Sequence, residues 1–456
     1  MAKYTTYASH KATNITGLEN IPEHWEIKQV RYLLLDGQDG IKIGPFGSAL
    51  KLEDMVEAGY KVYGQENVIK KDFSLGKRWI SENKFNAMQV YRVHSGDILI
   101  TMMGTSGKCE IVPDDHQTGI IDSHLIRLGL QKDKMLPKFF KVLIDGTLEI
   151  EYQVKIQGKG SIMHGPNSSI IKSLELPIPP LSEQKDILNF LDHETAQIDT
   201  LIEKQQTLIQ LLKEKRQAVI SHAVTKGLNP DAPMKDSGVE WLGEVPEHWS
   251  IPQIGYHSKV TKLTGFEYTN LWRPSIEGSI IALRGFNIQE RYLDLSKTEK
   301  ITEQLSNKLE RSKLHEGDIV LPCTGTLGNA ALIQESNLYH INQNIAKVSI
   351  DKKLFKPEFA VLWMTSLPFR QMIDFNNTSG MQPVLLIGDI RKLPIPLAPL
   401  YEQQEIVDFL LLKTEQFDRL IDSAELAIQL MQERRTALIS AAVTGKIDVR
   451  GWRASE

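Results

Sequence analysis

Several segments of this chain match part of a catalytic motif, but each lacks a residue that the motif requires. Gly104–Cys109 has the glycines and lysine of a phosphate-binding loop, but Met102 replaces the first glycine, and Cys109 follows the lysine where Ser or Thr is needed. His193–Gln197 begins like a zinc-protease helix, but Gln197 occupies the second ligand position. Pro113–Asp115 lacks the Glu-x-Lys of a nuclease cluster and is interpreted as a turn. We therefore predict no catalytic residue and no metal site.

Polar residues recur instead in pairs of matching segments. Ile121–His124 occupies the position in the first copy that Ile341–Asn344 occupies in the second, and Gly160–His164 matches Thr378–Gln382 in the same way. The polar residues of these segments differ between the copies. When two similar domains bind different ligands, matching segments with different polar residues are expected. Asn, Gln, Arg and His can each bond to base edges in the major groove of DNA, so a nucleic acid is a candidate ligand.

A Gly-Thr-x-Gly turn also recurs, at Gly104–Gly107 and Gly325–Gly328, and its hydroxyl and amide groups could contact phosphates or bases. With basic and amide residues of predicted loops, the candidate DNA contacts are Gln65, Asn67, Lys70, Lys71, Arg78, Thr105, Ser106, His124, Ser161, His164, Arg284, Asn287, Arg291, Thr326, Asn329, Asn344, Ser379 and Gln382. Two alternatives remain open: a turn needed only for folding and, for single residues, ordinary solvated surface.

The elements that must position these residues are duplicated. Pro22–Trp25 returns as Pro246–Trp249, and His94–Ile98 returns in altered form as His315–Ile319. A third segment, Ser221–Thr225, returns in altered form as Ser440–Thr444. The three offsets are nearly equal, at roughly 220 residues, which is far longer than the roughly 20 to 50 residues of a solenoid repeat. The period therefore indicates a duplicated domain and two sites.

Each copy begins with short apolar runs broken by Gly, Pro, Asn and Asp, which indicates mixed α/β structure. Gly96–Ile100 is predicted as a turn that leads into a buried strand, and Gly317–Leu321 as its counterpart. Each copy then ends in one helix of roughly 45 residues, about 67 Å long. The first is predicted to start after Pro180 with Ser182 as N-cap and to stop near Gly227; the second runs from about Tyr401 to Gly445.

The two helices carry the same apolar stripe at heptad spacing. The predicted pairing residues are Ile187, Leu191, Ile198, Leu201, Leu208, Leu212 and Val219 in the first helix, and Ile406, Leu410, Phe417, Leu420, Ala427, Met431 and Leu438 in the second. Side positions such as Ile202, Ile209 and Ile220, matched by Ile421, Ile428 and Ile439, widen the apolar face. We expect the helices to pack antiparallel on each other. The alternative is a dimerisation coiled coil.

Composition limits the class of protein. The chain has 456 residues, 41% of them apolar, and a net charge of −4, so a surface for nucleic acid must be locally basic. Cys109 and Cys323 stand alone, which argues against a disulfide framework and a zinc site. Met1–Asn14 has no signal-like apolar segment, and no apolar run approaches the roughly 18 residues of a membrane span. We therefore expect a cytoplasmic protein.

Six segments in and after the first predicted helix match one known family: Leu181–Gln184, Phe190–Asp192, Ile198–Asp199, Lys215–Ile220, Asp236–Gly243 and Pro246–Trp249. At these residues the chain resembles the specificity subunits of type I restriction-modification systems. Leu400–Lys446 matches more loosely but in register, and the resemblance covers nearly the whole chain.

This resemblance implies a non-catalytic subunit in which each of two target-recognition domains reads one half of a split, asymmetric double-stranded DNA target. The helices are then expected to set the spacer and to dock two methyltransferase subunits. No cofactor is expected in this chain: the methyltransferase subunits would bring S-adenosylmethionine for adenine methylation, and restriction subunits would bring ATP and Mg²⁺ for translocation and cleavage. The family's recognition domains vary, so no base-reading residue is carried over.

We therefore predict an α/β (mixed α+β) fold in which two similar globular domains are separated by two long antiparallel helices that form a coiled-coil spacer with internal pseudo-two-fold symmetry. The predicted parts are an N-terminal arm (1–20), recognition domain 1 (21–180), helical spacer 1 (181–227), a linker (228–240), recognition domain 2 (241–398), helical spacer 2 (399–446) and a C-terminal tail (447–456). Two other functions remain open: a coiled-coil scaffold that holds two protein partners without binding DNA, and a self-contained DNA enzyme with degenerate motifs.

Overall fold

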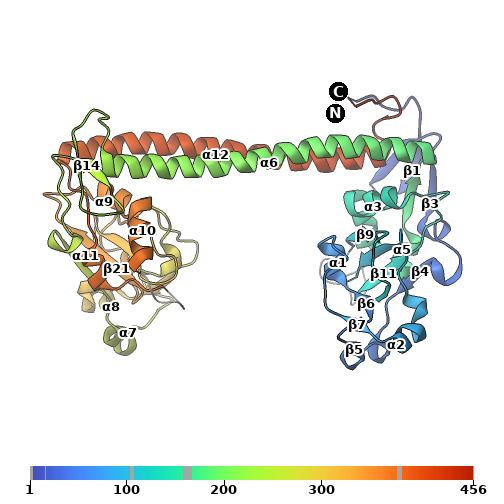
Figure 1. Cartoon of the computed structure of the whole chain (residues 1–456), viewed down its shortest axis with the longest axis horizontal. Coiled ribbons are helices and arrows are strands. Elements are labelled where there is room, and N and C mark those ends of the chain that lie inside the picture. The colour runs from blue at the N-terminus through green and yellow to red at the C-terminus, as the bar shows by residue number, and fades with distance from the viewer. Residues whose placement is uncertain (1–3, 16, 103–106, 158–166, 377–382, 455–456) are drawn as a thin grey trace. The chain divides into compact units, whose positions relative to one another are not determined.

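The computed structural model describes residues 4–15, 17–102, 107–157, 167–376 and 383–454. The chain forms two compact units: unit 1 comprises Met1–Gln205 and Leu426–Glu456, and unit 2 comprises Gln206–Glu425. Both boundaries fall inside a long helix. Each unit therefore contains one mixed α/β domain and one half of each long helix (Figure 1). The seven-part division of the chain stays a prediction.

Unit 1 contains two four-stranded sheets. The first is antiparallel, with the strand order β4 (Ile41–Ile43), β11 (Leu125–Leu128), β8 (Ile98–Thr101), β9 (Cys109–Ile111). The second has the order β10 (Gly119–Ile121), β6 (Tyr60–Tyr63), β7 (Trp79–Ile80), β5 (Met55–Val56), and its β10 and β6 are parallel. Two strand pairs complete the unit: β1 (His10–Ile15) with β2 (Leu18–Pro22), and β3 (Glu26–Gln29) with β12 (Glu175–Ile178).

Unit 2 repeats this topology. Its antiparallel sheet has the order β15 (Ser258–Lys262), β21 (Ile345–Ile350), β18 (Ile319–Pro322), β19 (Ala331–Leu332). Its second sheet has the order β17 (Glu299–Ile301), β16 (Ile280–Leu283), β20 (Tyr339–Ile341), again with one parallel pair, β16 and β20. A separate pair joins β13 (Met234–Asp236) to β14 (Glu244–Pro246). The predicted mixed α/β class and the duplication are therefore confirmed, as are the buried strands β8 and β18 that follow the Gly-Asp turns.

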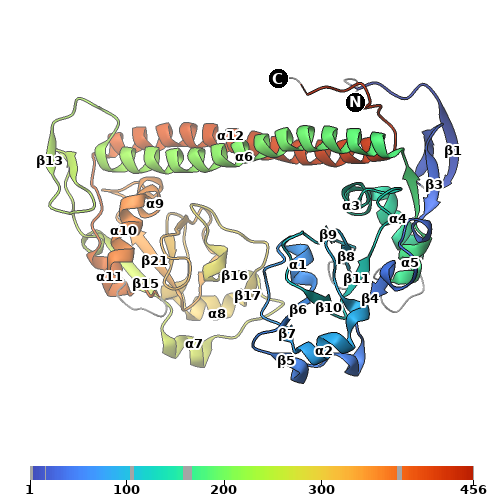
Figure 2. The ribbon, with the colours of Figure 1, turned by 45° about the vertical axis from the view of Figure 1, so that its right-hand side comes forward.

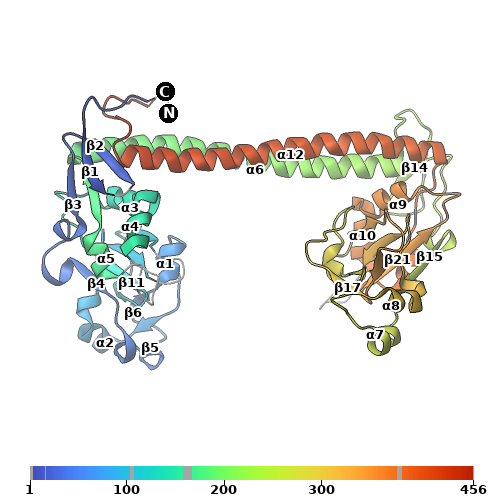
Figure 3. The same ribbon diagram turned by 180° about the vertical axis from the view of Figure 1, so that it is seen from behind.

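Short helices cover the sheets in both units. They are α1 (Gln65–Ile69), α2 (Glu82–Ala87), α3 (Pro137–Gly146), α4 (Leu148–Gln157) and α5 (Ser168–Ser173) in unit 1, and α7 (Gly265–Leu271), α8 (Glu303–Lys308), α9 (Pro357–Met364), α10 (Leu367–Asn376) and α11 (Ile387–Lys392) in unit 2. In unit 1, α3 lies between the antiparallel sheet and the long helices, and α9 takes the same place in unit 2 (Figure 3).

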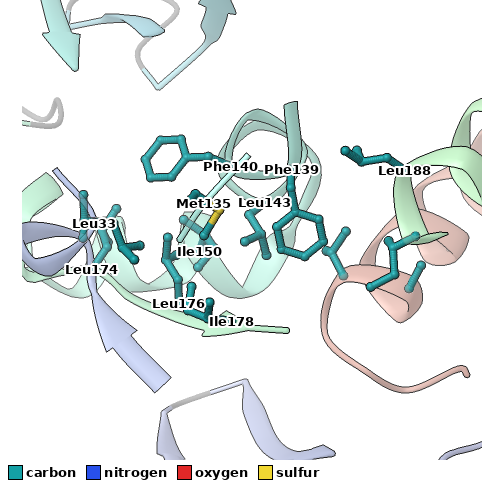
Figure 4. Packing of buried hydrophobic residues seen from close by; sticks show 14 of the residues in the cluster. Leu33, Met135, Phe139, Phe140, Leu143, Ile150, Leu174, Leu176, Ile178 and Leu188 are labelled. Carbon is teal, nitrogen blue, oxygen red and sulfur yellow. The ribbon is translucent and has the colours of Figure 1, made fainter. Parts of the chain in front are cut away.

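The position of α3 follows from its apolar faces. Pro137 stands at its first position, where a missing backbone N–H costs nothing, and Phe139, Phe140 and Leu143 are fully buried. Figure 4 shows Phe139 on the side of α3 toward Leu188 of the long helix, with Phe140 directed to the other side. One continuous core thus joins the sheet, α3 and the helix in unit 1.

The long helices are α6 (Leu181–Lys226) and α12 (Leu400–Val443), and they lie side by side (Figure 2). Gly227 and Gly445, with φ of +71° and +75°, end them as predicted, because glycine adopts the left-handed conformation readily. The predicted N-cap is wrong. The helix already begins at Leu181, and the carbonyl of Pro180 accepts the first bond, from Gln184 N at 2.9 Å, so Ser182 lies inside the first turn.

Equivalent ion pairs fix the antiparallel direction of the two helices inside each unit. In unit 1, Arg435 Nε donates to Asp199 Oδ1 at 2.8 Å. In unit 2, Arg216 Nη2 lies 3.4 Å from Asp418 Oδ1. The step forward along α6 from position 199 to position 216 equals the step back along α12 from position 435 to position 418. The two pairs therefore share one antiparallel register.

The residues of the apolar stripe are covered to different extents, and their pairing stays a prediction. Ile187, Leu191, Ile198, Ile406, Leu410 and Leu438 are buried, and Leu212, Val219, Phe417, Ala427 and Met431 are half-buried. Leu201, Leu208 and Leu420 are wrong as pairing residues, because their exposed fractions are 48%, 43% and 53%. The isoleucines one position along are better covered: Ile421 is buried, and Ile202, Ile209 and Ile428 are half-buried.

Two further observations concern the whole described chain. Cys109 and Cys323 are both buried free thiols, one in each unit, and burial raises the pKa of Cys323 to about 11. Of the helices within residues 4–454 that the structure describes, none is both long and apolar enough to cross a membrane.

Candidate functional site

The repeated Pro-Glu-His-Trp segment joins each domain to the helix that ends it. Trp25 Nε1 donates to Glu183 Oε1 at 3.0 Å, and His24 Nε2 lies 2.8 Å from Glu183 Oε2. Glu183 stands in the first turn of α6, and Tyr7 of the N-terminal arm adds a third hydrogen bond to its carboxylate. Burial, followed by this bond, raises the pKa of Tyr7, which keeps its hydroxyl a donor. The segment therefore has a structural role.

Unit 2 contains the same joint. Trp249 Nε1 donates to Glu402 Oε2 at 2.9 Å, and His248 Nε2 lies 2.7 Å from Glu402 Oε1. Burial acts to raise the pKa of Glu402, but the hydrogen bonds from Trp249 and His248 outweigh it and hold the pKa below its usual value. Sequence reasoning predicted no partner for Glu183 or Glu402. The recurrence of the same Glu at the start of both helices was the signal that could have identified its partners.

The repeated His-x-Gly-Asp-Ile segment is also structural. Asp97 is buried, and its Oδ2 accepts from the backbone N of His94 at 2.8 Å and lies 3.3 Å from Arg127 Nη1. Asp318 repeats this arrangement, with Lys347 Nζ at 3.4 Å in place of the arginine. A buried charge must be paired to be tolerated, which explains why a cation stands opposite each carboxylate.

Two candidate contacts are corrected by the structure. Asn67 has no exposed surface: its Oδ1 accepts from Gly64 N at 2.9 Å, and its Nδ2 donates to the carbonyls of Asp72 and Leu75 at 3.0 and 2.9 Å. Asn287 repeats this pattern with the backbone of Arg284, Asp294 and Lys297. Because both amides are buried and occupied inside their loops, neither can contact an external ligand.

The turns after the parallel strands keep one backbone and expose different side chains. In unit 1, the buried Asp122 accepts from His124 N at 2.9 Å, and His124 is exposed. In unit 2, the buried Asn342 takes the place of Asp122, and Asn344 is exposed. The carbonyl of His124 accepts from the N of residue 102 at 3.0 Å, and that of Asn344 accepts from the N of residue 323 at 2.7 Å. His124 and Asn344 are thus equivalent exposed positions of two matching turns.

The remaining candidate contacts of unit 1 differ in whether their side chains are bonded inside the protein or exposed. Arg78 bonds Asp122 at 2.9 Å and Glu66 at 3.1 Å. Burial acts to lower the pKa of Arg78, but the bonds to the two carboxylates outweigh it and raise the pKa. Lys70 and Lys71 are exposed at the end of α1, where Lys71 has φ of +55°, and Gln65 is half-buried at the start of that helix.

In unit 2, Arg284 is exposed and lies 3.5 Å from Glu299, and Thr326 is exposed in the second glycine turn. Asn329 is half-buried, and its Nδ2 donates to the carbonyl of Ile288 at 3.0 Å. Arg291 is half-buried. Six candidates lie outside the described residues: Thr105, Ser106, Ser161, His164, Ser379 and Gln382.

A metal centre has no support in the part of the chain that the structure describes, where no group of three or more His, Cys, Asp or Glu side chains is placed to hold an ion. The exposed candidates are polar or basic groups: His124, Asn344, Arg284 and Thr326 lie in loops next to strands, and Lys70 and Lys71 lie at the end of α1. Such groups can form hydrogen bonds to a ligand laid against the loops.

Comparison with known proteins agrees with this description. The family model for the type I restriction modification DNA specificity domain matches residues 50–211 and 282–429. The EcoBI specificity subunit of Escherichia coli is 24% identical over 382 residues, covering 80% of this chain and 76% of the relative. The putative MjaX specificity subunit of Methanocaldococcus jannaschii is 21% identical over 446 residues, covering 95% and 96%.

Solved structures show the same fold. A chain from a study of complex assembly and conformational transition of the type I R-M system aligns with a TM-score of 0.65 at 14% identity, covering 93% of this chain and 98% of that one. The HsdS subunit from Thermoanaerobacter tengcongensis aligns with a TM-score of 0.52 at 12% identity, covering 94% and 99%.

Proposed function

We propose, from the premise that the chain belongs to the type I restriction-modification DNA specificity family, that each of its two domains binds one half of a two-part DNA target. As a DNA specificity subunit it is expected to act with methyltransferase and restriction subunits. Those subunits would supply S-adenosylmethionine, ATP and Mg²⁺, and this chain would supply no catalytic group. Its place of action would then be the cytoplasm, where its DNA target lies.

The observation that supports two-part reading is the pair of matching turns with different exposed side chains. Asp122 accepts from the N of His124, and Asn342, at the equivalent position, accepts from the N of the next residue at 2.6 Å, while His124 and Asn344 are exposed in the two turns. An imidazole and a carboxamide offer different donors and acceptors to a base edge, so the two domains would prefer different bases.

Exposed leucines on the long helices support docking of methyltransferase subunits. Helix pairing does not bury these residues, which are Leu201, Leu426 and Leu430 in unit 1, and Leu208, Leu211, Leu411, Leu412 and Leu420 in unit 2. Large apolar side chains exposed along a helix are expected where another protein binds. We propose that these leucines contact the partner subunits and that the length of the helix pair sets the spacer of the target.

The test is to exchange the two exposed side chains in the complete complex. His124→Asn and, separately, Asn344→His would be produced with the partner subunits, and methylated adenines would be mapped across a genome. We expect each variant to alter or relax the preference in one half of the target and to leave the other half unchanged.

The two substitutions control each other, because they make opposite changes at equivalent positions. Alteration of the same half by both variants, or of neither half, would contradict the assignment of one domain to each half. Duplex binding that is absent, or that does not weaken with added salt, would instead favour the protein scaffold, since phosphate contacts make DNA affinity fall with salt.

A further inference from the structure

Three arginines gather where the second domain meets the long helices in unit 2. Arg216 belongs to α6, Arg370 to α10, and Arg291 to the loop after β16. Arg216 lies 3.4 Å from Asp418, and Arg370 lies 2.9 Å from Glu290. Arg291 has no ion-pair partner among the described residues. Three positive charges thus face two negative ones.

The cluster also has more hydrogen-bond donors than acceptors. The Nε atoms of Arg216, Arg291 and Arg370 are each buried without an acceptor in the described part of the protein. Burial, then Arg216, lowers the pKa of Arg291 most strongly, and Arg370 adds to the effect, while Glu290 and Asp418 oppose it. A buried guanidinium group without enough acceptors destabilises the free protein, so such a cluster is expected to serve an external anion.

The backbone holds the cluster in place. Arg291 has φ of +72°, which side chains other than glycine rarely adopt, and its N donates to the carbonyl of Ala330 at 2.8 Å. Gly328 lies so close to Arg370 that a Cβ at this glycine would come 2.8 Å from Arg370 Cγ. The loop of Arg291 is therefore fixed on the second glycine turn, with Arg370 beside it.

The equivalent positions of unit 1 hold no such cluster, although all three are described and the fold is the same. Arg435, the counterpart of Arg216, forms a two-bond pair with Asp199 through Nε at 2.8 Å and Nη2 at 3.3 Å. The counterpart of Arg291 is Lys71, which is exposed, and the counterpart of Arg370 is Glu151, an acid. The arginine cluster is therefore a feature of unit 2 that pairing of the helices does not require.

We propose that Arg216, Arg291 and Arg370 form a binding site for a backbone phosphate of the DNA target. Arg216 and Arg370 are 22% and 32% exposed, so an anion can reach them, and guanidinium groups match the oxygens of a phosphate through paired N–H bonds. This inference rests on the proposed function. A phosphate held here would connect DNA to the domain and to α6 together, and it would position the duplex without reading its sequence.

The test measures DNA binding of the complete complex against salt concentration, with one duplex that contains the target and one that lacks it. Arg291→Gln and Arg370→Gln are expected to weaken binding of both duplexes by a similar factor. Each is expected to reduce the slope of log affinity against log salt by up to about 0.9, the value for one phosphate contact. Arg419→Gln, which removes an exposed arginine paired with Glu415 on α12, is the matched control and should leave the slope unchanged.

A second measurement separates a binding role from a structural one. Inorganic phosphate should raise the melting temperature of the wild-type chain more than that of Arg291→Gln, and this variant should melt no lower than the wild type without phosphate. Arg291→Lys keeps the charge and should restore most of the salt slope.

Four outcomes would overturn the phosphate site. The first is weaker binding of the target duplex alone with a changed methylated sequence, which would make Arg291 a base reader. The second is unchanged DNA binding with lost assembly of the methyltransferase subunits, which would indicate a carboxylate of a protein partner. The third is a lower melting temperature of Arg291→Gln with unchanged DNA binding, which would indicate a purely structural network. The fourth is no salt-dependent DNA binding by the wild type, which would refute the proposed function itself.

Discussion

The two units have the same fold but differ in the contacts of an arginine at equivalent positions of the long helices. In unit 1, Arg435 forms two hydrogen bonds to Asp199. In unit 2, Arg216 lies 3.4 Å from Asp418 and close to two further arginines. The joints of Trp25 and Trp249, by contrast, are the same in both units. The two copies have therefore kept the residues that fix each domain to its helix and differ in the residues that we propose face a ligand.

The largest expected effect comes from shortening the helix pair. The register that pairs 199 with 435 also places Gln205 opposite Gln429. Removal of four residues at both places, about one turn, shortens the pair by roughly 5 to 6 Å while keeping its seam. We expect the spacer of the methylated target to shorten by about one or two base pairs, at 3.4 Å each. An unchanged spacer would disprove the idea that helix length sets it.

Removal of four residues from α6 alone is the control for this change. It would misalign every seam contact beyond the deletion, so we expect a large loss of stability in place of a new spacer.

The next largest effect is expected at the two tryptophan joints. Trp25→Ala and Trp249→Ala each remove a fully buried ring and a hydrogen bond, and the cost is about 3 to 5 kcal/mol of unfolding free energy. Both joints have a further tyrosine bond, but Tyr7, which bonds Glu183, is buried, whereas Tyr401, which bonds Glu402 at 3.0 Å, is exposed; we therefore expect the loss to be smaller at Trp25. Circular dichroism in urea measures both losses, and substitution by Phe separates ring packing from the hydrogen bond. A larger loss at Trp25 would mean that the arm does not support its joint.

A smaller effect is expected from the carboxylate of the second joint. The folded pKa of Glu402 lies below the unfolded value of about 4.3, so its charged form stabilises the fold above that pH. This stability is lost as the pH falls through the folded pKa. Glu402→Gln should cost about 1 to 3 kcal/mol at pH 7 and progressively less in acid. Unfolding curves measured between pH 3 and pH 7, roughly the span in which such carboxylates titrate, test this. An equal cost at every pH would contradict the role of the charge.

The smallest expected effect distinguishes the two faces of α6. Leu201 is exposed, so Leu201→Ala should change the stability of the isolated chain by less than about 0.5 kcal/mol. Ile202 packs against the core of unit 1, so Ile202→Ala should cost about 1 to 2 kcal/mol. If Leu201 contacts a methyltransferase subunit, its substitution should weaken assembly, measured by titration of that subunit. Equal stability losses at both positions would indicate that Leu201 is a pairing residue after all.

The sequence predicted the parts of the fold that repeat with a clear period or end at a special residue. Gly227 and Gly445 marked the ends of the long helices, and the Gly-Asp turns marked β8 and β18. The stripe was wrong only at Leu201, Leu208 and Leu420. Leu201 and Ile202, for example, are both apolar, and only packing in the folded unit decides which of them is buried.

The candidate DNA contacts were harder to predict because an amide side chain in a loop can point either to solvent or into the loop. Asn67 was chosen for its residue type, but its amide ties the loop together, whereas His124 projects from a turn held by its neighbour. The arginine cluster was only partly visible. Arg291 was a candidate, but Arg216 and Arg370 lie far from it in the sequence and come beside it only in the folded unit.

The two buried thiols have a practical consequence. Cys109 lies in unit 1 and Cys323 in unit 2, and neither is paired. A thiol reagent can modify each one only when the segment around it opens, because burial covers the group and raises its pKa, which keeps it protonated. The rates of alkylation at the two cysteines therefore report the local opening of each half separately, in a single sample and without any introduced label.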